Sequence, residues 1–446
     1  MTANIRTQFV CVLACAGILL HAVGSACATW SIVMTDTRTS EVAAGTVTCL
    51  NQFDLLALVP VVVVGKGAAA CQASGDFDGQ RRPVIFNGLI AGVDPQAMLA
   101  QVALIPGHAS RQYGIADVQG RTITFTGPSC APWAGGLTGR DGDVVYAIQG
   151  NILTGECVVA NIEAAIRANP WDLPTRLMAG MRAARDAGGD GRCSCPASPP
   201  DCGCPPPSFN KSGHIGGVIV ARLGDQDDEV CNAAGCAGGR YYLQLNVAYQ
   251  PASRPDPVDQ LMTRFALWRA SLAGRPDAIR SLVSFSPAVY TPPDTVSSTM
   301  RIELRDWTNS PISVPVQSVV VMHAPDSPGL TQFGTPVQVE PGVFELPLTR
   351  PVSSGVDRLV VSVDAGGERP IVLMPLPRFP VHTVGDVNCD ALVTLDDIDA
   401  FVTALTAPGD FATVFPACDP LSADCNGDGR VDFDDIDAFV ARLIGA

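Results

Sequence analysis

The segment Thr29-Trp30-Ser31-Ile32-Val33 decides where the fold begins, because a hydroxyl residue is followed at once by an apolar run that predicts a strand. Before it lie Arg6, the apolar run Phe9–Val23 and the small residues Gly24–Ala28. This order is typical of a secretory signal peptide that is cut after Ala28. The apolar run is shorter than the roughly 20 residues that a membrane-spanning helix needs. We therefore expect residues 1–28 to be a signal peptide, followed by a secreted or cell-surface protein with no membrane span.

The cysteine content agrees with export. Sixteen cysteines are present, and removal of the leader with Cys11, Cys15 and Cys27 leaves thirteen. In an oxidising compartment most of these are expected to form disulfides, and the odd number leaves at least one thiol free. A lipoprotein cut before Cys27 is the alternative to the signal peptide.

The negative charge is concentrated at one end of the chain. The net charge is −15, and the part from Val384 onward holds thirteen Asp and two Arg, a balance of −11 that leaves −4 for the remainder. No basic run is present that would attract phosphate groups. The charge distribution therefore argues against DNA or RNA as a partner.

The length of 446 residues predicts two to four domains. Between residues 29 and 290, strand patterns alternate with helical periodicity, and aspartates stand where the first turns of three helices begin. This pattern favours layered sheets flanked by helices, an α+β class. The strand candidates are Trp30–Thr35, Val59–Gln72, Ile115–Thr126, Asp143–Leu153, His214–Leu223 and Tyr241–Tyr249. The helix candidates are Pro95–Ile105, Val158–Ala168, Leu173–Ala187 and Pro257–Leu272, with Asp94, Asp172 and Asp256 as N-terminal caps.

Two further segments complete the expected large and middle domains. Residues 191–210 are rich in Cys, Pro and Gly and predict a surface insertion. Residues 296–376 hold short apolar runs with turn residues between them, which predicts a small β-sandwich.

Residues 384–446 contain a duplicated unit. VTLDDIDAFVTAL at Val393–Leu405 and VDFDDIDAFVARL at Val431–Leu443 share nine of thirteen positions. Each follows a loop with oxygen-bearing residues at positions 1, 3, 5 and 12, and calcium needs such a loop together with a backbone carbonyl at position 7. The expected ligands of two Ca²⁺ ions are Asp386, Asn388, Asp390, Leu392 and Asp397 in the first loop, and Asp424, Asn426, Asp428, Arg430 and Asp435 in the second.

With Asp at position 12, residues 385–446 resemble a type I dockerin, in which a helix is kept only after each loop. The resemblance implies a small helical module and a cohesin-like domain or cell-surface scaffold as partner. The first loop departs from the pattern, since Ala391 stands where glycine usually makes the turn. Cys389, Cys418 and Cys425 could form one disulfide in this module.

An N-terminal threonine has chemical meaning. Its hydroxyl is a weak nucleophile, but its own α-amine, with a pKa of about 8, can take the proton. The runs GAAACQA (67–73), QYGIAD (112–117), TGPSCAPWAG (126–135), QGNIL (149–153) and Gly188-Gly189-Asp190 make residues 29–284 similar to domain-of-unknown-function family 1028. That family is assigned to the Ntn (N-terminal nucleophile) hydrolase superfamily, which implies a four-layer αββα fold.

The same resemblance implies Thr29 as the catalytic nucleophile of an amidohydrolase of unknown substrate, with Asn151 offering its amide to an oxyanion. Asp190 and Ser212 match polar positions of the family without a defined role. Whether the domain is an enzyme stays open, because a non-catalytic binding or assembly protein could use the same fold. A polysaccharide-degrading role rests only on the dockerin, and the large domain offers no obvious carboxylate pair for it.

Other reactive residues have simpler explanations. Cys130 is a rival nucleophile, although a buried or disulfide-bonded cysteine is the more common case. Lys66 could tune a neighbouring group or merely lie solvated at a strand end. Cys193, Cys195, Cys202 and Cys204 could bind zinc, but export favours disulfides.

Overall fold

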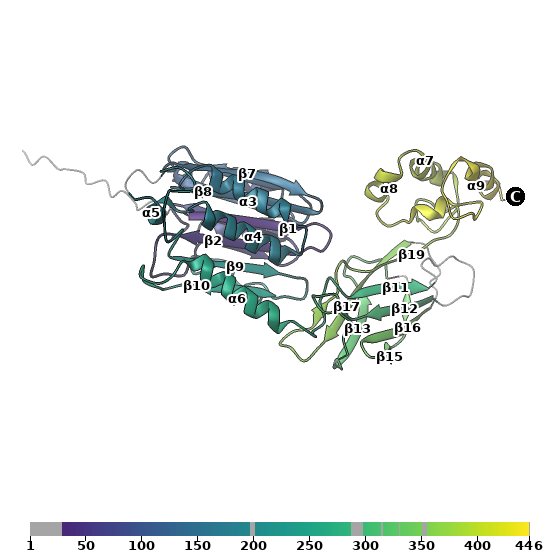
Figure 1. Cartoon of the computed structure of the whole chain (residues 1–446). Helices are drawn as coiled ribbons and strands as arrows, with labels where there is room; N and C mark the ends of the chain where they lie inside the picture. The colour runs from purple at the N-terminus through teal and green to yellow at the C-terminus, as the bar shows by residue number, and fades with distance from the viewer. Residues whose placement is uncertain are drawn as a thin grey trace, which may run out of the picture.

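The computed structural model describes residues 29–196, 201–286, 298–313, 315–329, 331–349 and 355–445 (Figure 1). The expected signal peptide, residues 1–28, lies outside these ranges. The mixed α+β class is confirmed, with several antiparallel sheets. In these ranges no helix is long and apolar enough to cross a membrane.

The large domain is built on a six-stranded antiparallel sheet with β1 (Thr29–Asp36) near its centre. Strand β1 pairs with β2 (Val42–Thr48) on one side and with β8 (Val144–Asn151) on the other. The sheet order is β10-β9-β2-β1-β8-β7, completed by β7 (Ala134–Asp141), β9 (Ile215–Ala221) and β10 (Leu243–Val247). Almost every residue of β1 is buried, so both faces of the strand are covered rather than one.

A second, four-stranded sheet packs face to face on the first. It runs in the order β3 (Pro60–Val63), β4 (Gly67–Ala73), β5 (Arg111–Asp117) and β6 (Thr122–Thr126). The core between the sheets contains many small side chains, among them Ala44, Ala68, Ala70, Ala116 and Ala147. Small residues at facing positions let the two sheets approach closely.

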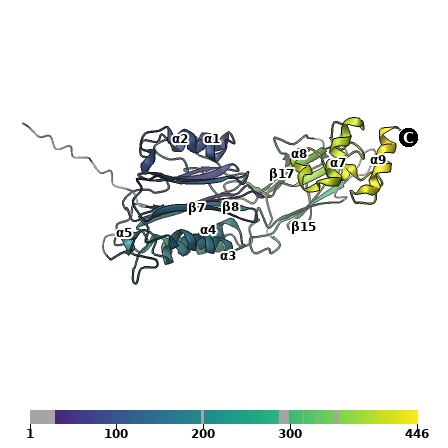
Figure 2. The same cartoon turned by 90° about the horizontal axis from the view of Figure 1, so that it is seen from above.

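Helices cover the outer face of each sheet, so that the layers follow the order helix, sheet, sheet, helix (Figure 2). Helices α1 (Arg82–Ile90) and α2 (Pro95–Ala103) lie on the four-stranded sheet. Helices α3 (Cys157–Ala168), α4 (Leu173–Asp186) and α6 (Pro257–Ser271) lie on the six-stranded sheet. The short α5 spans Gly191–Ser194, and a 3-10 turn, η1, spans His108–Ser110. The expected caps Asp94, Asp172 and Asp256 each accept a hydrogen bond from a first-turn backbone N–H.

Two predicted strands are each two strands in the structure. The run Val59–Gln72 is divided by a turn in which Gly65 has φ +65° and Lys66 is exposed. The run Ile115–Thr126 is divided at Gly120, with φ +83°. Positive φ is easy only for residues without a Cβ, so these glycines mark hairpin turns that the apolar pattern hid. Strands β2 and β7 and helix α1 were not predicted.

The middle part of the chain contains two packed antiparallel systems of strands. One has the order β11-β12-β16-β14, with β15 also on β16, and the other has the order β13-β17-β18, with β19 also on β17. Their bounds are β11 Leu282–Ser286, β12 Ser298–Glu303, β13 Ser318–His323, β14 Gln332–Phe333, β15 Val337–Glu340, β16 Val343–Thr349, β17 Gly355–Asp364, β18 Ile371–Val372 and β19 Arg378–Val381. One core, including Ile302, Leu346 and Val361, joins both systems. Strand β11 falls in the range expected for the large domain, but it pairs with β12.

The C-terminal part holds short helices around one small core. They are η2 (Leu395–Asp397), α7 (Ile398–Thr406), α8 (Pro408–Val414), η3 (Pro420–Ala423), η4 (Phe433–Asp435) and α9 (Ile436–Leu443). The two copies of the repeat meet through Phe401 and Phe439, whose rings stack with centroids 3.9 Å apart.

A buried arginine ties the large domain to the segment that leads into the middle domain. The Arg222 guanidinium is 2.6 Å from Glu41 and 3.1 Å from Asp277, and it lies over the Tyr242 ring. All three charged side chains are buried. Burial by itself raises the pKa of Asp277, but Arg222 and backbone N–H groups outweigh it and hold that pKa below its usual value.

Replacing Arg222 with Met should lower the free energy of unfolding by about 3–5 kcal/mol, because two buried carboxylates lose their counter-ion. The control is Arg38→Met, which removes an exposed pair with Asp143 and should cost at most about 1 kcal/mol. Urea unfolding followed by tryptophan fluorescence measures both. Equal costs for the two variants would show that the buried cluster does not hold the junction together.

Candidate functional site

The candidate nucleophile and the candidate oxyanion donor lie side by side. Thr29 opens β1 and pairs in register with Asn151, the last residue of β8. The Thr29 backbone N–H donates to Asn151 Oδ1 over 3.2 Å. Thr29 is 1% exposed and Asn151 is fully buried. The structure thus brings together two residues that are 122 positions apart in the chain.

Glutamine side chains connect this strand end to the second sheet. Gln72 Nε2 donates to the Thr29 carbonyl over 2.7 Å and to Gln112 Oε1 over 3.0 Å. Gln112 Nε2 in turn donates to the Gly150 carbonyl over 2.7 Å. Both glutamines are buried in strands. Sequence reasoning gave them no role, although a polar residue in a fully buried strand run is the signal that could have marked them.

Two buried amides are less well satisfied. Within the described parts of the chain, neither amide atom of Gln149 has a hydrogen-bond partner, and neither has Asn151 Nδ2. The Gln149 side chain occupies the space where a Cβ on Gly114 would lie, only 2.1 Å from Gln149 Oε1. Gly114 therefore has to be glycine for Gln149 to lie between the sheets.

Asp190 and Ser212 hold the chain together locally. The Asp190 carboxylate accepts from Cys49 N over 2.7 Å and forms an ion pair of 2.8 Å with Arg192. Burial raises the pKa of Asp190, against the opposing effect of Arg192 and the backbone N–H groups. Ser212 donates through its hydroxyl to Asp256 over 2.9 Å. These contacts account for both polar positions without a catalytic role.

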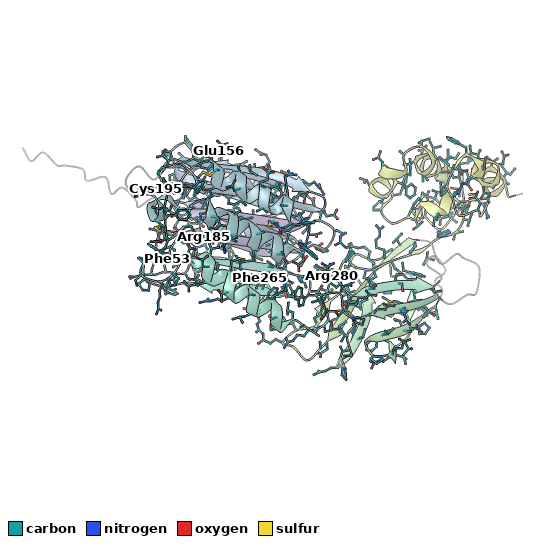
Figure 3. The ribbon with its side chains drawn as sticks, viewed as in Figure 1. Phe53, Glu156, Arg185, Cys195, Phe265 and Arg280 are labelled. Carbon is teal, nitrogen blue, oxygen red and sulfur yellow. A yellow bond between two sulfur atoms is a disulfide. The ribbon has the colours of Figure 1, made fainter. Side chains whose placement is uncertain are left out.

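The cysteines form mostly disulfides, as expected for export. The pairs are Cys49–Cys193, Cys157–Cys204, Cys195–Cys202, Cys231–Cys236 and Cys389–Cys418. The zinc alternative for the insertion therefore gives way to disulfides, and Cys195 lies at the end of the large domain that carries α5 (Figure 3). In the described ranges Cys71, Cys130 and Cys425 remain free thiols.

The rival nucleophile Cys130 is poorly suited to attack. Burial raises the pKa of its thiol, and Sγ lies 3.4 Å from the Arg111 carbonyl. A raised pKa keeps the sulfur protonated at neutral pH, whereas a nucleophilic cysteine needs the thiolate. Lys66 is exposed in the β3–β4 turn, as expected for a solvated lysine.

The first acidic loop closes on itself through its own carboxylates. Asp386 Oδ2 accepts from Ala391 N over 3.2 Å, and Asp390 Oδ1 accepts from Leu392 N over 2.9 Å. Asp397, the residue at position 12, reaches back to accept from Asn388 N over 3.0 Å. Asp386 and Asp397 are buried.

The second loop repeats this arrangement. Asp424 Oδ2 accepts from Gly429 N over 2.9 Å, Asp428 Oδ1 accepts from Arg430 N over 2.9 Å, and Asp435 accepts from Asn426 N over 3.0 Å. Among the described residues of each loop, no three carboxylates place oxygen atoms within 4.8 Å of one another. The carboxylate oxygens are instead directed at the backbone N–H groups of their own loop.

Both repeats also expose the same apolar positions. Leu395 and Phe433 are 73% and 68% exposed, Ile398 and Ile436 are 40% and 39%, and Val402 and Val440 are 48% and 46%. Each set lies at the beginning of a repeat helix and along it. Matched exposure at matched positions yields two equivalent apolar surfaces, which we call the repeat surfaces.

Comparison with known proteins gives one family and no curated relative. No curated protein matches the chain. The crystal structure of a Silicibacter pomeroyi protein of family DUF1028 covers 54% of this chain and 88% of its own, at 17% identity and a TM-score of 0.38. The Yersinia pseudotuberculosis adhesin InvE covers 24% of this chain and 27% of its own, at 19% identity and a TM-score of 0.20. Both TM-scores are too low to establish a common fold.

The family model that matches is described as a family of unknown function, DUF1028. It covers residues 29–198, a shorter stretch than the 29–284 suggested by the motifs, and it does not reach the acidic repeats. Residues 29–198, which include Thr29, Asn151 and Asp190, are therefore the part of the chain that is similar to the DUF1028 family.

Proposed function

We propose that this is an extracellular protein whose C-terminal module, of the dockerin type, binds two calcium ions and docks the large domain onto a cohesin-like domain or another surface scaffold. Ten cysteines are paired in disulfides, eight in the large domain and two in the C-terminal module. Disulfides in such number indicate an oxidising compartment. The observation that carries the proposal is the matched geometry of the two acidic loops.

The backbone of the two loops turns in the same way. At position 4 the residues Cys389 and Gly427 have φ +61° and +81°, and at position 6 the residues Ala391 and Gly429 have φ +72° and +84°. A calcium loop needs a sharp turn at position 6. Ala391 adopts that turn although its Cβ disfavours it, so the first loop keeps the calcium-loop course without the usual glycine.

The donor chemistry fits a hard cation. Each loop offers three carboxylates, one Asn side chain and a backbone carbonyl at position 7, from Leu392 or Arg430, and Ca²⁺ prefers such an all-oxygen set. A bound ion would supply the positive charge that three crowded carboxylates need. The carboxylates would then turn from backbone N–H groups toward the ion, and the Cys389–Cys418 disulfide would keep the first loop attached to the helical core meanwhile.

The repeat surfaces supply the partner contact in this proposal. Exposed leucine, isoleucine, valine and phenylalanine on a small acidic module are costly in water unless another protein covers them. Their position on the helices that follow the calcium loops would make docking depend on calcium, since the loops fix how the helices are presented.

Calcium titration of the full exported chain should show two sites per molecule. Asp397→Ala and Asp435→Ala should each remove one site, because each deletes the position-12 ligand of one loop. The controls Asp399→Ala and Asp437→Ala change neighbouring aspartates that lie two residues beyond position 12 of each loop and should keep both sites. Calorimetry measures the stoichiometry. No calcium uptake by the parent chain, or equal losses in the control variants, would refute the proposal.

A second candidate function, N-terminal nucleophile amide hydrolysis, is favoured by the hydrogen bond between the Thr29 amine nitrogen and Asn151. Once the leader is removed, that nitrogen is the α-amine. It would take the proton from Thr29 Oγ1 as the oxygen attacks an amide carbonyl, and the leaving amine would then receive that proton. Asn151 Oδ1 would orient the amine, while Asn151 Nδ2 could donate to the oxyanion.

The burial of Thr29 is the main argument for the non-catalytic alternative. Thr29 and Asn151 are buried in the uncleaved chain, so hydrolysis requires that removal of the leader or movement of the covering segments opens the site. If no such motion occurs, the domain acts as a scaffold and the glutamine network only joins the sheets.

Mature protein beginning at Thr29 should hydrolyse at least one member of a panel of amide substrates. Thr29→Ala should lose detectable turnover because it lacks the hydroxyl, whereas Thr29→Ser should retain turnover. Asn151→Ala should lower kcat by about 100-fold or more if its amide holds the oxyanion. The control Thr138→Ala removes an exposed hydroxyl on β7 and should leave turnover unchanged. Activity that survives Thr29→Ala would exclude this mechanism.

A further inference from the structure

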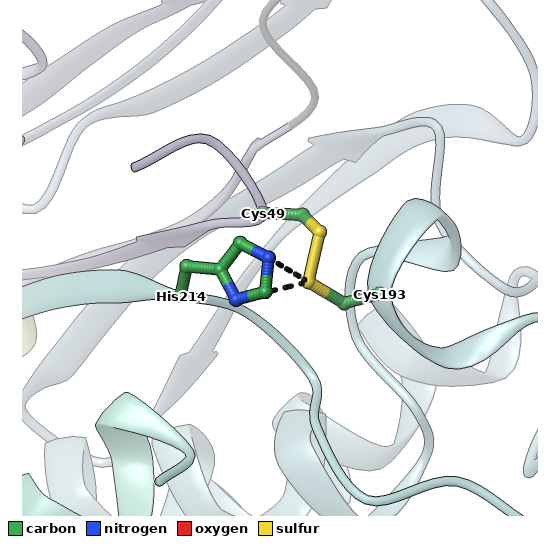
Figure 4. Close-up of side chains that lie close together, drawn as sticks. All are labelled: Cys49, Cys193 and His214. Atoms are coloured by element: carbon green, nitrogen blue, oxygen red, sulfur yellow. Dashed lines mark hydrogen bonds between the residues drawn. A yellow bond between two sulfur atoms is a disulfide. The ribbon is translucent and has the colours of Figure 1, made fainter. Parts of the chain in front are cut away.

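Three metal-ligating side chains meet just beyond the end of β2, the strand that pairs with β1. Cys49 and Cys193 form a disulfide, and the His214 ring lies against it, with Nε2 at 3.5 Å and Nδ1 at 3.7 Å from Cys193 Sγ (Figure 4). One ligand atom from each residue lies within 4.8 Å of the other two, the closest such grouping of His, Cys, Asp and Glu in the described ranges. All three side chains are partly exposed, so small molecules can reach them.

The backbone around these residues is fixed by contacts that do not involve the disulfide. Asp190 accepts from Cys49 N through its carboxylate over 2.7 Å, and its carbonyl accepts from Cys193 N over 3.0 Å. The backbone N–H of His214 donates to the Thr48 carbonyl over 2.7 Å. Opening the S–S bond would therefore free two side chains but leave their Cα positions in place.

We propose that Cys49, Cys193 and His214 form a latent zinc site, closed in the oxidised protein by the disulfide and opened by a dithiol reductant. In a tetrahedral zinc site, Zn–S distances of about 2.3 Å and Zn–N distances of about 2.0–2.1 Å place sulfur and nitrogen ligands about 3.6 Å apart. The observed separation of Cys193 Sγ from His214 Nε2 is 3.5 Å. The imidazole is thus already at ligand distance from one of the two sulfurs.

Only the two sulfur atoms have to move. A disulfide holds them about 2.0 Å apart, whereas two thiolates on one zinc ion lie about 3.8 Å apart, so side-chain rotation has to separate them by about 1.8 Å. With two thiolates and one imidazole bound, one of four positions stays open for water or another ligand. Sites with three protein ligands and an open position are the kind that zinc enzymes use.

The reductant supplies the electrons and protons that opening the Cys49–Cys193 disulfide requires. A dithiol transfers two electrons and two protons to the Cys49–Cys193 bond, which becomes two thiols, and the dithiol itself becomes a disulfide. Zinc then replaces the two thiol protons, which are released to solvent. Exchange with an oxidised disulfide, which takes up the two electrons and is reduced to a dithiol, would re-form the Cys49–Cys193 bond and release the ion.

The test uses the full exported chain, reduced without oxygen by a dithiol that is then removed, and incubated with or without ZnCl₂. A pulse of alkylating reagent followed by peptide mapping reports the reactivity of each cysteine separately. Zinc should slow alkylation of Cys49 and Cys193 in the parent chain. Cys231 and Cys236 serve as the internal control, because in the described ranges this disulfide pair belongs to no group of three potential metal ligands. Cobalt(II) in place of zinc should give a thiolate-to-metal charge-transfer band.

His214→Ala is the decisive variant, because it keeps every thiol and removes one of three ligands. It should raise the zinc concentration needed for protection by about 100-fold or more, since even partners that only orient a ligand are worth 10- to 100-fold. Equal protection in His214→Ala and the parent chain, or none in either, would overturn the proposal.

Cys71 is a buried free thiol, and burial raises its pKa to about 12. Its reactivity toward the alkylating reagent therefore reports whether the domain stays folded. Rapid alkylation of Cys71 after reduction would show that the scaffold fails without the disulfide, which also overturns the site.

Discussion

The pairing of β1 with β2 on one side and β8 on the other is the constraint on which the large domain depends. Seven of its eight residues are buried, so the strand has helices against one face and the second sheet against the other. A register shift of one residue would exchange these two faces and place Trp30 and Ile32 between the sheets. The same register sets Thr29 opposite Asn151, so the geometry of the candidate site is a consequence of the sheet.

The ends of these strands are held by buried polar contacts rather than by apolar packing. Gln72 and Gln112 connect the two sheets at Thr29, and Asp190 connects the β2 end to the Cys-rich insertion. Buried polar groups are tolerated only when they find partners, and these contacts therefore fix geometry more than they add stability. The insertion is consequently tied to the strand end that carries Thr29. A candidate nucleophile and a candidate zinc site share this end of the sheet through Thr48, the last residue of β2, and Cys49, which follows it.

The C-terminal module is held together by a small core and by contacts within its loops. Its core is small, and the stacked rings of Phe401 and Phe439 are the main contact between the repeats. Each loop is closed by hydrogen bonds from its backbone to its own carboxylates. In the proposed function, calcium would take over that role and leave the repeat surfaces for a partner.

The sequence by itself determined what depends on local pattern: the α+β class, three helix caps, the strand that begins at Thr29, the duplicated acidic loops and the fact that most cysteines form disulfides. It did not separate β3 from β4, because the turn at Gly65 lies within one continuous apolar run. Only the tertiary structure decided which residues meet over long distances, namely Thr29 with Asn151, Gln72 with Gln112, and Cys49 with Cys193 and His214. The physical reason is that such contacts are set by strand order and register, which depend on how whole layers bury their faces together and leave no local signal in the chain.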